Sequence, residues 1–488
     1  MDRCIQREMS KLSANIVGSG PNGLAAAITL AECGVAVTVF ERNERIGGAC
    51  STAELTLPGF KHDVGSSCFP LGVASRFLRS LPLEDYGLKW IEPPAPLAHP
   101  LDDGTAVLLE HDLEQTCAHL GRHDARAWRA LLGPSVRDWD QLVEAITAPW
   151  MGLPQRLDTM VGFGVVAGLP ARMLARAAFN EKRTRALFAG LAAHSVIPLT
   201  HVGSSAVAIV LASAGHRTGW PVAEGGAGSI THALAAYLRS LGGRIVVDFE
   251  VHSLQKIGKL NPADITIFDT SVDSMMEIAG DALTESFRAR LRSFRRGPGI
   301  FKVDYALREP IPWKAQECLR AGTVHVGGAL EEIVRSEADA FAGRQNDRPF
   351  VLVVQPSLFD PERAPAAVDG TAQHTAWAYC HVPSGSNEDR TAVIEAQIER
   401  FAPGFADCVL ARKSWNATAL ELANPNLQCG DVSGGAMTLD QLVARPTLRG
   451  YRTSNRAIYL CSSSTVPGGG VHGMCGFNAA LAALRDWA

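Results

Sequence analysis

Near its amino terminus the chain carries a strand, a glycine-rich turn, a helix and a second strand in direct succession. A short apolar run at residues 14–17 leads into Gly18-Ser19-Gly20-Pro21-Asn22-Gly23, residues 24–32 are strong helix formers, and a β-branched run at residues 35–40 ends at Glu41. In this context Gly18 permits a tight turn, Gly20 lets a pyrophosphate approach, and Gly23 lets helix and strand pack closely. The segment therefore predicts a parallel sheet with a dinucleotide at its edge.

The residues around the turn indicate which dinucleotide binds. The helix that starts at Pro21 and Asn22 offers unpaired N–H groups and a partial positive charge to phosphates. Glu41 lies where a carboxylate accepts both hydroxyls of a ribose, which argues against a 2′-phosphorylated ligand. The extension from Glu41 to the glycine pair Gly47-Gly48 resembles the pattern of FAD-binding two-dinucleotide flavoproteins. We therefore predict FAD.

A second glycine cluster lies near the carboxyl end, in Pro467-Gly468-Gly469-Gly470-Val471-His472-Gly473. A strand-like run at residues 456–460 precedes the cluster, and a helical pattern at residues 478–484 follows it. A helix N-terminus and free backbone N–H groups there would stabilise negative charge on the N1–O2 edge of a reduced flavin. The predicted flavin contacts are Gly469, Gly470, Val471 and Gly473, so the two clusters are two halves of one predicted site.

The middle of the chain predicts a return to the nucleotide domain. A glycine-rich turn at 219–229 leads into a helical pattern over 230–241, and strand-like runs follow at 244–251 and 263–269. We expect an α/β fold in which a Rossmann-like FAD-binding domain of the two-dinucleotide type is interrupted by an α+β substrate domain. The FAD-binding domain is predicted to comprise residues 14–110, 219–305 and 437–488, and the substrate domain residues 111–218 and 306–436.

Histidines and tryptophans accumulate in the predicted substrate domain: His194, His201, His216, Trp313, His325, Trp377, His381 and Trp415. A lone histidine is more often packed or exposed than catalytic, and tryptophan more often forms core or pocket wall, so the sequence singles out none of them. The most apolar segment, residues 160–179, is expected to form a buried or pocket-lining helix. Shallow insertion into a membrane surface, a peripheral membrane contact, is the alternative.

Charge and cysteine usage exclude several classes of function. The net charge of −4 gives no reason to expect a nucleic-acid partner. The eleven cysteines are scattered without a C-x-x-C pair, so neither a metal site nor a redox dithiol is predicted. This pattern suits a reducing compartment, and no signal peptide or transmembrane run is apparent. We expect a cytoplasmic protein, with membrane association as the alternative.

Several motifs together resemble one known family. Gly18 to Gly23, Glu41 to Gly48, Pro58-Gly59-Phe60 with His62-Asp63, and Pro467 to Gly473 are similar to the phytoene dehydrogenase-related flavoproteins. That group overlaps the carotenoid desaturases and isomerases within the wider amine oxidase-like superfamily, and the resemblance runs through nearly the whole chain. Residues 323–329 and 377–383 look most like the bacterial branch related to the pyridine nucleotide-disulfide oxidoreductase domain 2 protein.

The resemblance implies further FAD contacts and shows two departures. It assigns Arg42 and Ala49 to the cofactor, Val251 to the adenine through its backbone, and Ser462 and Ser463 to the phosphate or ribityl chain. The family usually carries glycine where Ser462 stands. Carotenoid desaturases commonly carry proline where His472 stands, which argues against a long polyene as substrate.

The resemblance implies FAD-dependent removal of a hydride from a hydrophobic, isoprenoid-like small molecule, with the cofactor as electron sink. Oxygen, a quinone and NAD(P) all remain open as electron acceptor, as does the oligomeric state. His472 is the candidate acid–base catalyst and Cys475 a weaker one. Three alternatives stay open: an amine oxidase with an aromatic cage beside the flavin, a redox-neutral FAD isomerase, and a flavin-binding scaffold with little turnover.

Overall fold

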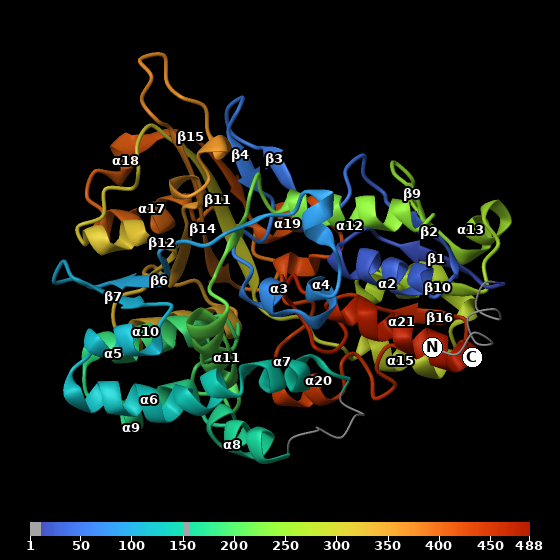
Figure 1. The fold of residues 1–488 in the computed structure, drawn as a ribbon, viewed down its shortest axis with the longest axis horizontal. Helices are drawn as coiled ribbons and strands as arrows, with labels where there is room; N and C mark the ends of the chain where they lie inside the picture. The colour runs from blue at the N-terminus through green and yellow to red at the C-terminus, as the bar shows by residue number, and fades with distance from the viewer. Residues whose placement is uncertain (1–10, 150–156) are drawn as a thin grey trace.

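Two sheets organise the computed structural model, which describes residues 11–149 and 157–488 (Figure 1). The first sheet has five strands in the order β16-β10-β1-β2-β9, and all of its neighbouring pairs are parallel. Its strands are β1 (Ser13–Val17), β2 (Ala36–Phe40), β9 (Arg244–Val246), β10 (Ile265–Phe268) and β16 (Ile458–Leu460). Three distant parts of the chain therefore build one parallel sheet, which confirms the predicted Rossmann-like α/β fold.

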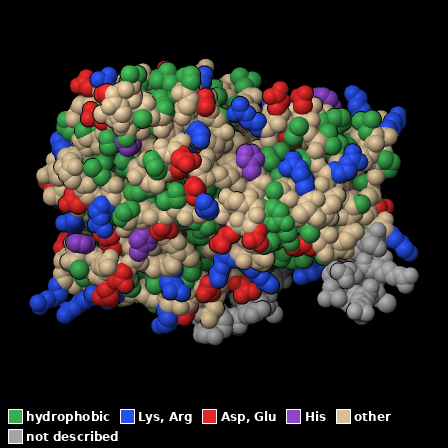
Figure 2. Space-filling model, turned by 45° about the horizontal axis from the view of Figure 1, so that its top comes forward, with side chains coloured by type: hydrophobic (Ala, Val, Ile, Leu, Met, Phe, Trp, Pro, Cys, Tyr) green, Lys and Arg blue, Asp and Glu red, His purple; other side chains and the backbone are tan. Residues whose placement is uncertain are grey.

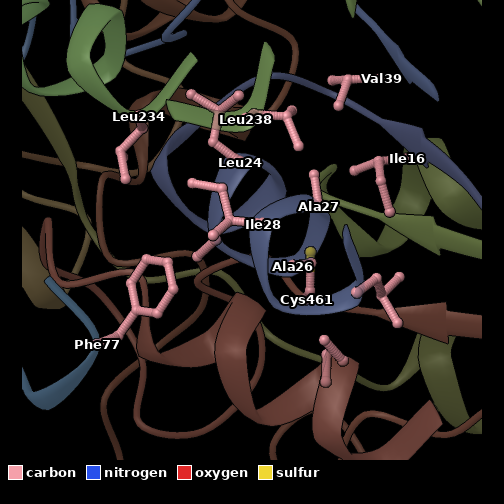
Figure 3. Close-up of a cluster of buried hydrophobic side chains, with 14 of the residues drawn as sticks. Ile16, Leu24, Ala26, Ala27, Ile28, Val39, Phe77, Leu234, Leu238 and Cys461 are labelled. Carbon is pink, nitrogen blue, oxygen red and sulfur yellow. The ribbon is translucent and has the colours of Figure 1, made fainter. Parts of the chain in front are cut away.

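The core of this unit forms around helix α2 (Pro21–Glu32), which packs between helices α12 (Gly228–Ser240) and α21 (Met474–Trp487). Figure 3 shows Leu24, Ala26, Ala27 and Ile28 of α2 between Leu234 and Leu238 of α12 and the strand residues Ile16 and Val39. The run of alanines in α2 lets neighbouring backbones approach closely while still burying apolar surface.

One predicted strand is shorter than expected. The pattern over residues 244–251 predicted a continuous strand, but β9 ends at Val246. The chain then turns at Asp248, which has a φ of +53°. The backbone N–H groups of residues 248 and 249 donate hydrogen bonds to the carbonyls of Asn43 and Glu41, in the loop after β2.

The second sheet has seven strands in the order β15-β11-β14-β13-β12-β6-β7. All its neighbouring pairs are antiparallel except β12 with β6. Its strands are β6 (Ala95–Pro100), β7 (Ala106–Leu109), β11 (Gly299–Leu307), β12 (Ala321–Val326), β13 (Val351–Val354), β14 (His374–Val382) and β15 (Val409–Trp415).

The membership of this sheet departs from the expected division of the chain. Strands β6 and β7 lie inside the segment 14–110 that the sequence assigned to the FAD-binding domain, yet they pair with β12. Strand β11 likewise starts before residue 306. Apolar strands of either sheet look alike in sequence, so hydrophobic patterning could not tell which sheet each would join. Apart from these strands, the domain boundaries stay a prediction.

Helices cover both faces of the seven-stranded sheet (Figure 1). The cluster that includes Leu352, Val354 and Trp377 packs on one face against α6 (Arg122–Arg137), α10 (Lys182–Ala193) and α11 (Ser204–Arg217). The opposite face packs against α17 (Thr391–Phe401) through Ile394 and Ile398.

The remaining elements are mostly short connections and peripheral helices. The helices are α3 (Pro70–Ala74), α4 (Arg76–Arg79), α5 (Leu113–Ala118), α7 (Trp139–Thr147), α13 (Leu254–Leu260), α14 (Val272–Ala279), α15 (Glu285–Arg292), α16 (Leu330–Phe341), α18 (Phe405–Cys408), α19 (Ala417–Ala423) and α20 (Leu439–Val443). The strands β3 (Thr52–Glu54) and β4 (Lys61–Asp63) form one small hairpin, and β5 (Trp90–Ile91) pairs with β8 (Val222–Ala223).

The most apolar segment is not the buried helix that we expected. Residues 160–179 fall into two helices, α8 (Leu157–Ala167) and α9 (Ala171–Ala178), which are separated before Pro170. Val165 is 66% exposed and Met173 50% exposed. Proline lacks the N–H that a continuous helix needs, so α8 and α9 turn part of their apolar surface outward.

On the face seen in Figure 2, positively and negatively charged side chains lie among one another. None of the helices formed by residues 11–149 and 157–488 is long and apolar enough to cross a membrane.

Candidate functional site

The first glycine turn packs tightly against the end of β10. A Cβ at Gly20 would lie 2.5 Å from the Asp269 carboxyl, and a Cβ at Gly23 only 2.2 Å from the Gly18 carbonyl oxygen. Gly18 itself has a φ of +101°, a conformation that side chains disfavour. The turn therefore has no room for side chains at these three positions, and its backbone stays close to the N-terminus of α2.

Glu41 lies at the end of β2 with its carboxylate buried and turned toward this turn. One carboxylate oxygen accepts hydrogen bonds from the Ser19 N–H (3.0 Å) and hydroxyl (2.7 Å), and the other from the Asn43 N–H (2.9 Å) and side-chain amide (3.1 Å). The two backbone donors hold the carboxylate in place. The Ser19 hydroxyl and the Asn43 amide are side-chain groups that can rotate away. Each of the two Glu41 carboxylate oxygens could then accept a hydrogen bond from a ligand.

The other residues predicted near the first cluster lie around Glu41. Arg42 pairs with Glu250 (3.8 Å), and Val251 is buried beside Val17 and Phe40, at the ends of β1 and β2. The backbone N–H of Gly47 donates to the Ser19 carbonyl (3.1 Å). Gly48 has a φ of +56°, and the next residue, Ala49, packs on Gly65 and reaches the cavity described below.

The two ends of the chain meet where α2 and α21 pack together. A Cβ at Gly476 would lie 1.8 Å from the carbonyl oxygen of Asn22, and one at Gly473 would lie 3.1 Å from the Cβ of Ala25. Backbone therefore touches backbone at the start of both helices, which are drawn in contact in Figure 1. The glycines beside and within the second cluster permit the first cluster to pack there.

A buried arginine, Arg445, holds the backbone around the rest of the second cluster through hydrogen bonds. Arg445 donates hydrogen bonds to the carbonyls of Ser463 (3.0 Å) and Ser433 (2.6 Å), and Ser433 packs in turn against Gly469. Gly470 has a φ of +127°, and Val471 is half-buried with its carbonyl beside Gly72. Ser462 is buried, and its carbonyl accepts from Thr465. Arg445 thus orders the backbone of a loop that the sequence assigned to the flavin.

The His472 side chain forms a hydrogen bond with the backbone of its own loop. Its side chain is buried, and Nδ1 accepts from the N–H of Met474 in the first turn of α21 (3.0 Å). Burial lowers the pKa of His472 to about 4. The Cys475 thiol, likewise buried, points to the carbonyl of Gly468 (3.4 Å), and burial raises its pKa to about 11. Neither residue lines the cavity described next, so their acid–base roles stay predictions.

Asp269 is a site residue that the sequence analysis did not select. It directly follows β10, and its carboxylate accepts from the N–H of Gly23 (2.8 Å) inside the glycine turn. Burial raises the pKa of Asp269 to about 7; the Gly23 N–H opposes this, and the charge of Glu41 adds to it. The signal was its place in the sequence, because ligands of such sheets bind beyond the carboxyl ends of parallel strands.

A cavity of about 250 Å³ adjoins Ala49 and lies over the seven-stranded sheet. Its floor consists of two rows of side chains that run across neighbouring strands of this sheet. One row is Lys302, Tyr379 and Leu352, the other is Trp377, Val354 and Thr323, and each residue is paired across strands with the next in its row. Its walls are formed by Ala49, residues 64–68, Pro70, His194, Leu211, Trp220, Ile300, Leu420, Leu427 and Val432. The lining is therefore mostly apolar and aromatic, with a few polar groups, which is typical of a small-molecule site.

The one charged residue among the described lining residues is Lys302, which is almost fully buried. Its ammonium donates to the Asp304 carboxylate (2.6 Å) and to the carbonyl of Asp63 (2.9 Å), and lies 5.2 Å from the centre of the Trp377 ring. These partners offset the positive charge of the lysine. Only the fold reveals this set, because Asp63 and Lys302 come from opposite halves of the chain.

The comparisons with known proteins agree with this arrangement. The family model of an NAD(P)-binding Rossmann-like domain matches residues 16–81. The chain is 27% identical to the mouse (Mus musculus) pyridine nucleotide-disulfide oxidoreductase domain-containing protein 2, over 97% of this chain and 93% of that one. It is 24% identical to a subunit of limonene dehydrogenase from Castellaniella defragrans over 98% and 95% of the two chains, and 36% identical to a 1-hydroxycarotenoid 3,4-desaturase of Flavobacterium over 21% and 20%.

Among solved structures, putrescine oxidase bound to putrescine superposes with a TM-score of 0.59 at 16% identity, over 97% of this chain and 98% of that one. These findings confirm the resemblance predicted from the motifs. The chain is an oxidoreductase with a dinucleotide-binding Rossmann-like domain, and its likeness to putrescine oxidase concerns the fold alone. Despite the name of its mouse relative, all cysteines among the described residues are free thiols.

Proposed function

We propose that this chain binds FAD across its two glycine clusters and uses it to oxidise a hydrophobic small molecule in the adjoining cavity. The observation that carries the proposal is the backbone contact between Asn22 and Gly476, because it joins the amino-terminal dinucleotide turn to the carboxyl-terminal loop. A nucleotide held by the first cluster alone would not need the second. FAD is long enough to use both.

The residues of the site fit FAD. The Gly18–Gly23 turn has no room for a Cβ at Gly18, Gly20 or Gly23, and it leads into the N-terminus of α2, where a diphosphate is stabilised. Glu41 keeps two backbone hydrogen bonds and can release two side-chain partners in favour of a ribose. Beyond Gly473, the N-terminal turn of α21 offers a positive helix end to a flavin. Bound FAD would supply a two-electron acceptor, while the protein orients the substrate and excludes water.

The cavity favours an uncharged hydrophobic substrate over an amine. The rings of Trp377 and Tyr379 are stacked with centroids 5.6 Å apart, which leaves no space for an amine between them. The described lining residues include no carboxylate that would pair with an ammonium group. A molecule of the size and apolar character of a monoterpene suits these walls, and limonene is the compound in the name of one relative. The likeness to putrescine oxidase concerns the fold alone.

The first test is the cofactor. We expect purified protein to be yellow and to release FAD, one per chain, on denaturation. Anaerobic mixing with limonene and with a panel of amines would then show which compound bleaches the flavin absorbance. Protein that is colourless and takes up no added flavin would refute the FAD assignment, and bleaching by amines alone would favour amine oxidation.

The ribose contact has its own test. Replacing Glu41 with alanine should weaken FAD binding by roughly tenfold to a hundredfold, since hydrogen bonds to a charged group are each worth about 1.5–3 kcal/mol. The dissociation constant would be measured by quenching of flavin fluorescence. Glu44→Ala is the matched control, because Glu44 is exposed in the same loop. Equal affinity in the Glu41→Ala variant and the wild type would remove Glu41 from the site.

Asp269 should make FAD affinity depend on pH. Its pKa of about 7 means that the free protein ionises this carboxyl as the pH rises through neutrality. The Cys461 and Cys475 thiols beside it stay neutral, because burial raises the pKa of both. The diphosphate of FAD at the same turn disfavours an ionised Asp269. We therefore expect the affinity to fall as the pH rises above about 7, by at most about tenfold per pH unit.

The variant Asp269→Asn keeps an acceptor for the Gly23 N–H and removes the charge. Its FAD affinity, titrated between about pH 6 and pH 8.5, should be nearly constant and should exceed that of the wild type at the alkaline end. Asp264→Asn, at the exposed start of the same strand, should retain the wild-type dependence. A wild-type affinity that does not vary with pH would contradict this account of Asp269.

A further inference from the structure

A half-buried histidine in the cavity wall and a fully buried one behind it form a hydrogen-bonded pair. Nε2 of His194 and Nε2 of His325 are 2.9 Å apart, so one of the two nitrogens must donate and the other accept. His194 follows α10 and lines the cavity, whereas His325 lies in β12 and is fully buried. The rings of Trp220 and His194 pack nearly perpendicular to each other, with centroids 5.8 Å apart, and this contact restricts the orientation of His194.

The pair presents one free nitrogen to the cavity. With its Nε2 occupied by His325, His194 retains Nδ1, for which no partner exists among the described residues. Nδ1 of His325 is unpaired and fully buried, whereas Nδ1 of His194 is unpaired but not fully buried. The free nitrogen of His194 therefore borders the cavity, where it can meet a polar group of a ligand among the apolar walls.

The hydrogen bond to His325 lets this nitrogen act in either direction. When His194 donates through Nε2, its Nδ1 carries a lone pair and accepts; when His325 donates, His194 carries the proton on Nδ1 and donates. The pair remains uncharged in both arrangements. Burial, aided by the nearby His381, lowers the pKa of His194 to about 3, and burial lowers the pKa of His325 as well.

The surroundings make room for the pair. A Cβ at Gly190 of α10 would lie 2.6 Å from Nδ1 of His325, so glycine is required where the ring meets the helix. Two polar groups of the floor already have partners: the Lys302 ammonium donates to Asp304 and to the carbonyl of Asp63, and the Thr323 hydroxyl lies 3.1 Å from the Cys68 thiol. A ligand with an ionised group would thus meet no available counter-charge among the described lining residues.

We propose that the substrate is a hydrophobic molecule with one uncharged hydrogen-bonding group, a hydroxyl or a carbonyl, which His194 binds through Nδ1 while His325 holds its ring in place. This inference deepens the proposed oxidation and rests on it, because it names the class of molecule for the same cavity. A hydroxyl would use the accepting arrangement of the pair and a carbonyl the donating one. His325 is a positioning residue, since it acts through His194.

The test uses four probes with one para-isopropylbenzene skeleton: p-cymene, cuminyl alcohol, cuminylamine and cuminate, which end in a methyl, a hydroxymethyl, an aminomethyl and a carboxylate group. Binding to the FAD-loaded protein would be measured by calorimetry and by tryptophan fluorescence, because Trp220 and Trp377 line the cavity. We expect cuminyl alcohol to bind about threefold to tenfold more tightly than p-cymene, and both ions to bind more weakly than the alcohol.

Variants assign that preference to the pair. In His194→Leu the alcohol and p-cymene should bind equally. His325→Phe should lose most of the preference, whereas His325→Gln, which can still bond to His194, should keep more of it. His216→Leu is the control, because His216 is a buried histidine bonded to Trp128 and to the Glu110 carbonyl, away from the cavity; it should keep the full preference.

Several results would overturn the inference: tightest binding of the amine or the acid, equal binding of alcohol and hydrocarbon to the wild type, no binding of any probe, or a preference that survives in His194→Leu. The flavin content of the same preparations separates this failure from failure of the proposed function. Flavin-free protein that still prefers the alcohol would refute FAD oxidation alone, and flavin-loaded protein without the preference would refute the histidine anchor alone.

Discussion

Replacing Gly476 with alanine should destabilise the protein and abolish FAD binding. In an ordinary helix, glycine to alanine stabilises by about 1 kcal/mol. Here the added methyl would lie 1.8 Å from the carbonyl oxygen of Asn22, on backbone that cannot rotate away. Forcing α21 away from α2 should cost about 3 kcal/mol or more, and it moves the second glycine cluster off the first. A change near the carboxyl end thus acts on the amino-terminal turn.

The measurements are the midpoint of thermal unfolding and the FAD retained after gel filtration. Gly258→Ala is the matched control, because Gly258 lies in helix α13 with open space around its Cβ position; this variant should be as stable as the wild type or slightly more stable, with full FAD. If Gly476→Ala were stabilising and kept its flavin, the close contact between the two helices would be wrong.

The parts of the fold that follow a local pattern could be predicted from the sequence. The apolar runs that end at Val17 and Phe40, with a glycine turn and a helix between them, specify a βαβ unit, and the structure has that unit as β1, α2 and β2. Such a segment can be recognised from its local sequence, because the strand, the turn and the start of the helix all have local sequence patterns. The same is true of β10, β16 and α21.

The cavity depends on contacts that no local pattern contains. In β11 the alternation of Lys302, Val303 and Asp304 is typical of a strand with one solvent-exposed face. In the structure, however, all three side chains are buried. Burial is compatible with these charges because Lys302 and Asp304 pair with each other and Lys302 reaches the carbonyl of Asp63. The histidine pair is similar, because residues 194 and 325 become neighbours only when α10 packs on the seven-stranded sheet.

A second long-range set of charges, around Arg363, should contribute the largest single side-chain effect on stability. Arg363 is fully buried; it donates to Asp63 (3.0 Å), to Asp360 (2.7 Å) and to the carbonyl of Ala223 (3.1 Å). It thus joins a strand end, a glycine turn and the loop after β13. We expect Arg363→Met to lower the free energy of unfolding by about 3–5 kcal/mol, because it leaves two carboxylates buried without their counter-charge.

The effect should reach the cavity through a chain of hydrogen bonds. Asp63 accepts from the Ser67 hydroxyl, and that hydroxyl accepts from the indole N–H of Trp377 in the cavity floor (2.7 Å). Loss of Arg363 frees Asp63 to move and loosens Trp377, so probe binding should weaken together with stability. Stability would be measured by chemical denaturation and tryptophan environment by fluorescence.

The control separates a buried ion pair from an exposed one. Arg129 makes a two-pronged contact with the two carboxylate oxygens of Glu114 (2.7 and 2.6 Å), but both side chains are largely exposed. Arg129→Met should therefore change stability by less than about 1 kcal/mol. Arg363→Lys should fall between the two, since a lysine restores the charge but cannot reach both carboxylates and the Ala223 carbonyl at once. If Arg363→Met proved as mild as Arg129→Met, Asp63 and Asp360 would have to be neutral or hydrated in the folded protein, and the link from this cluster to Trp377 would fail with it.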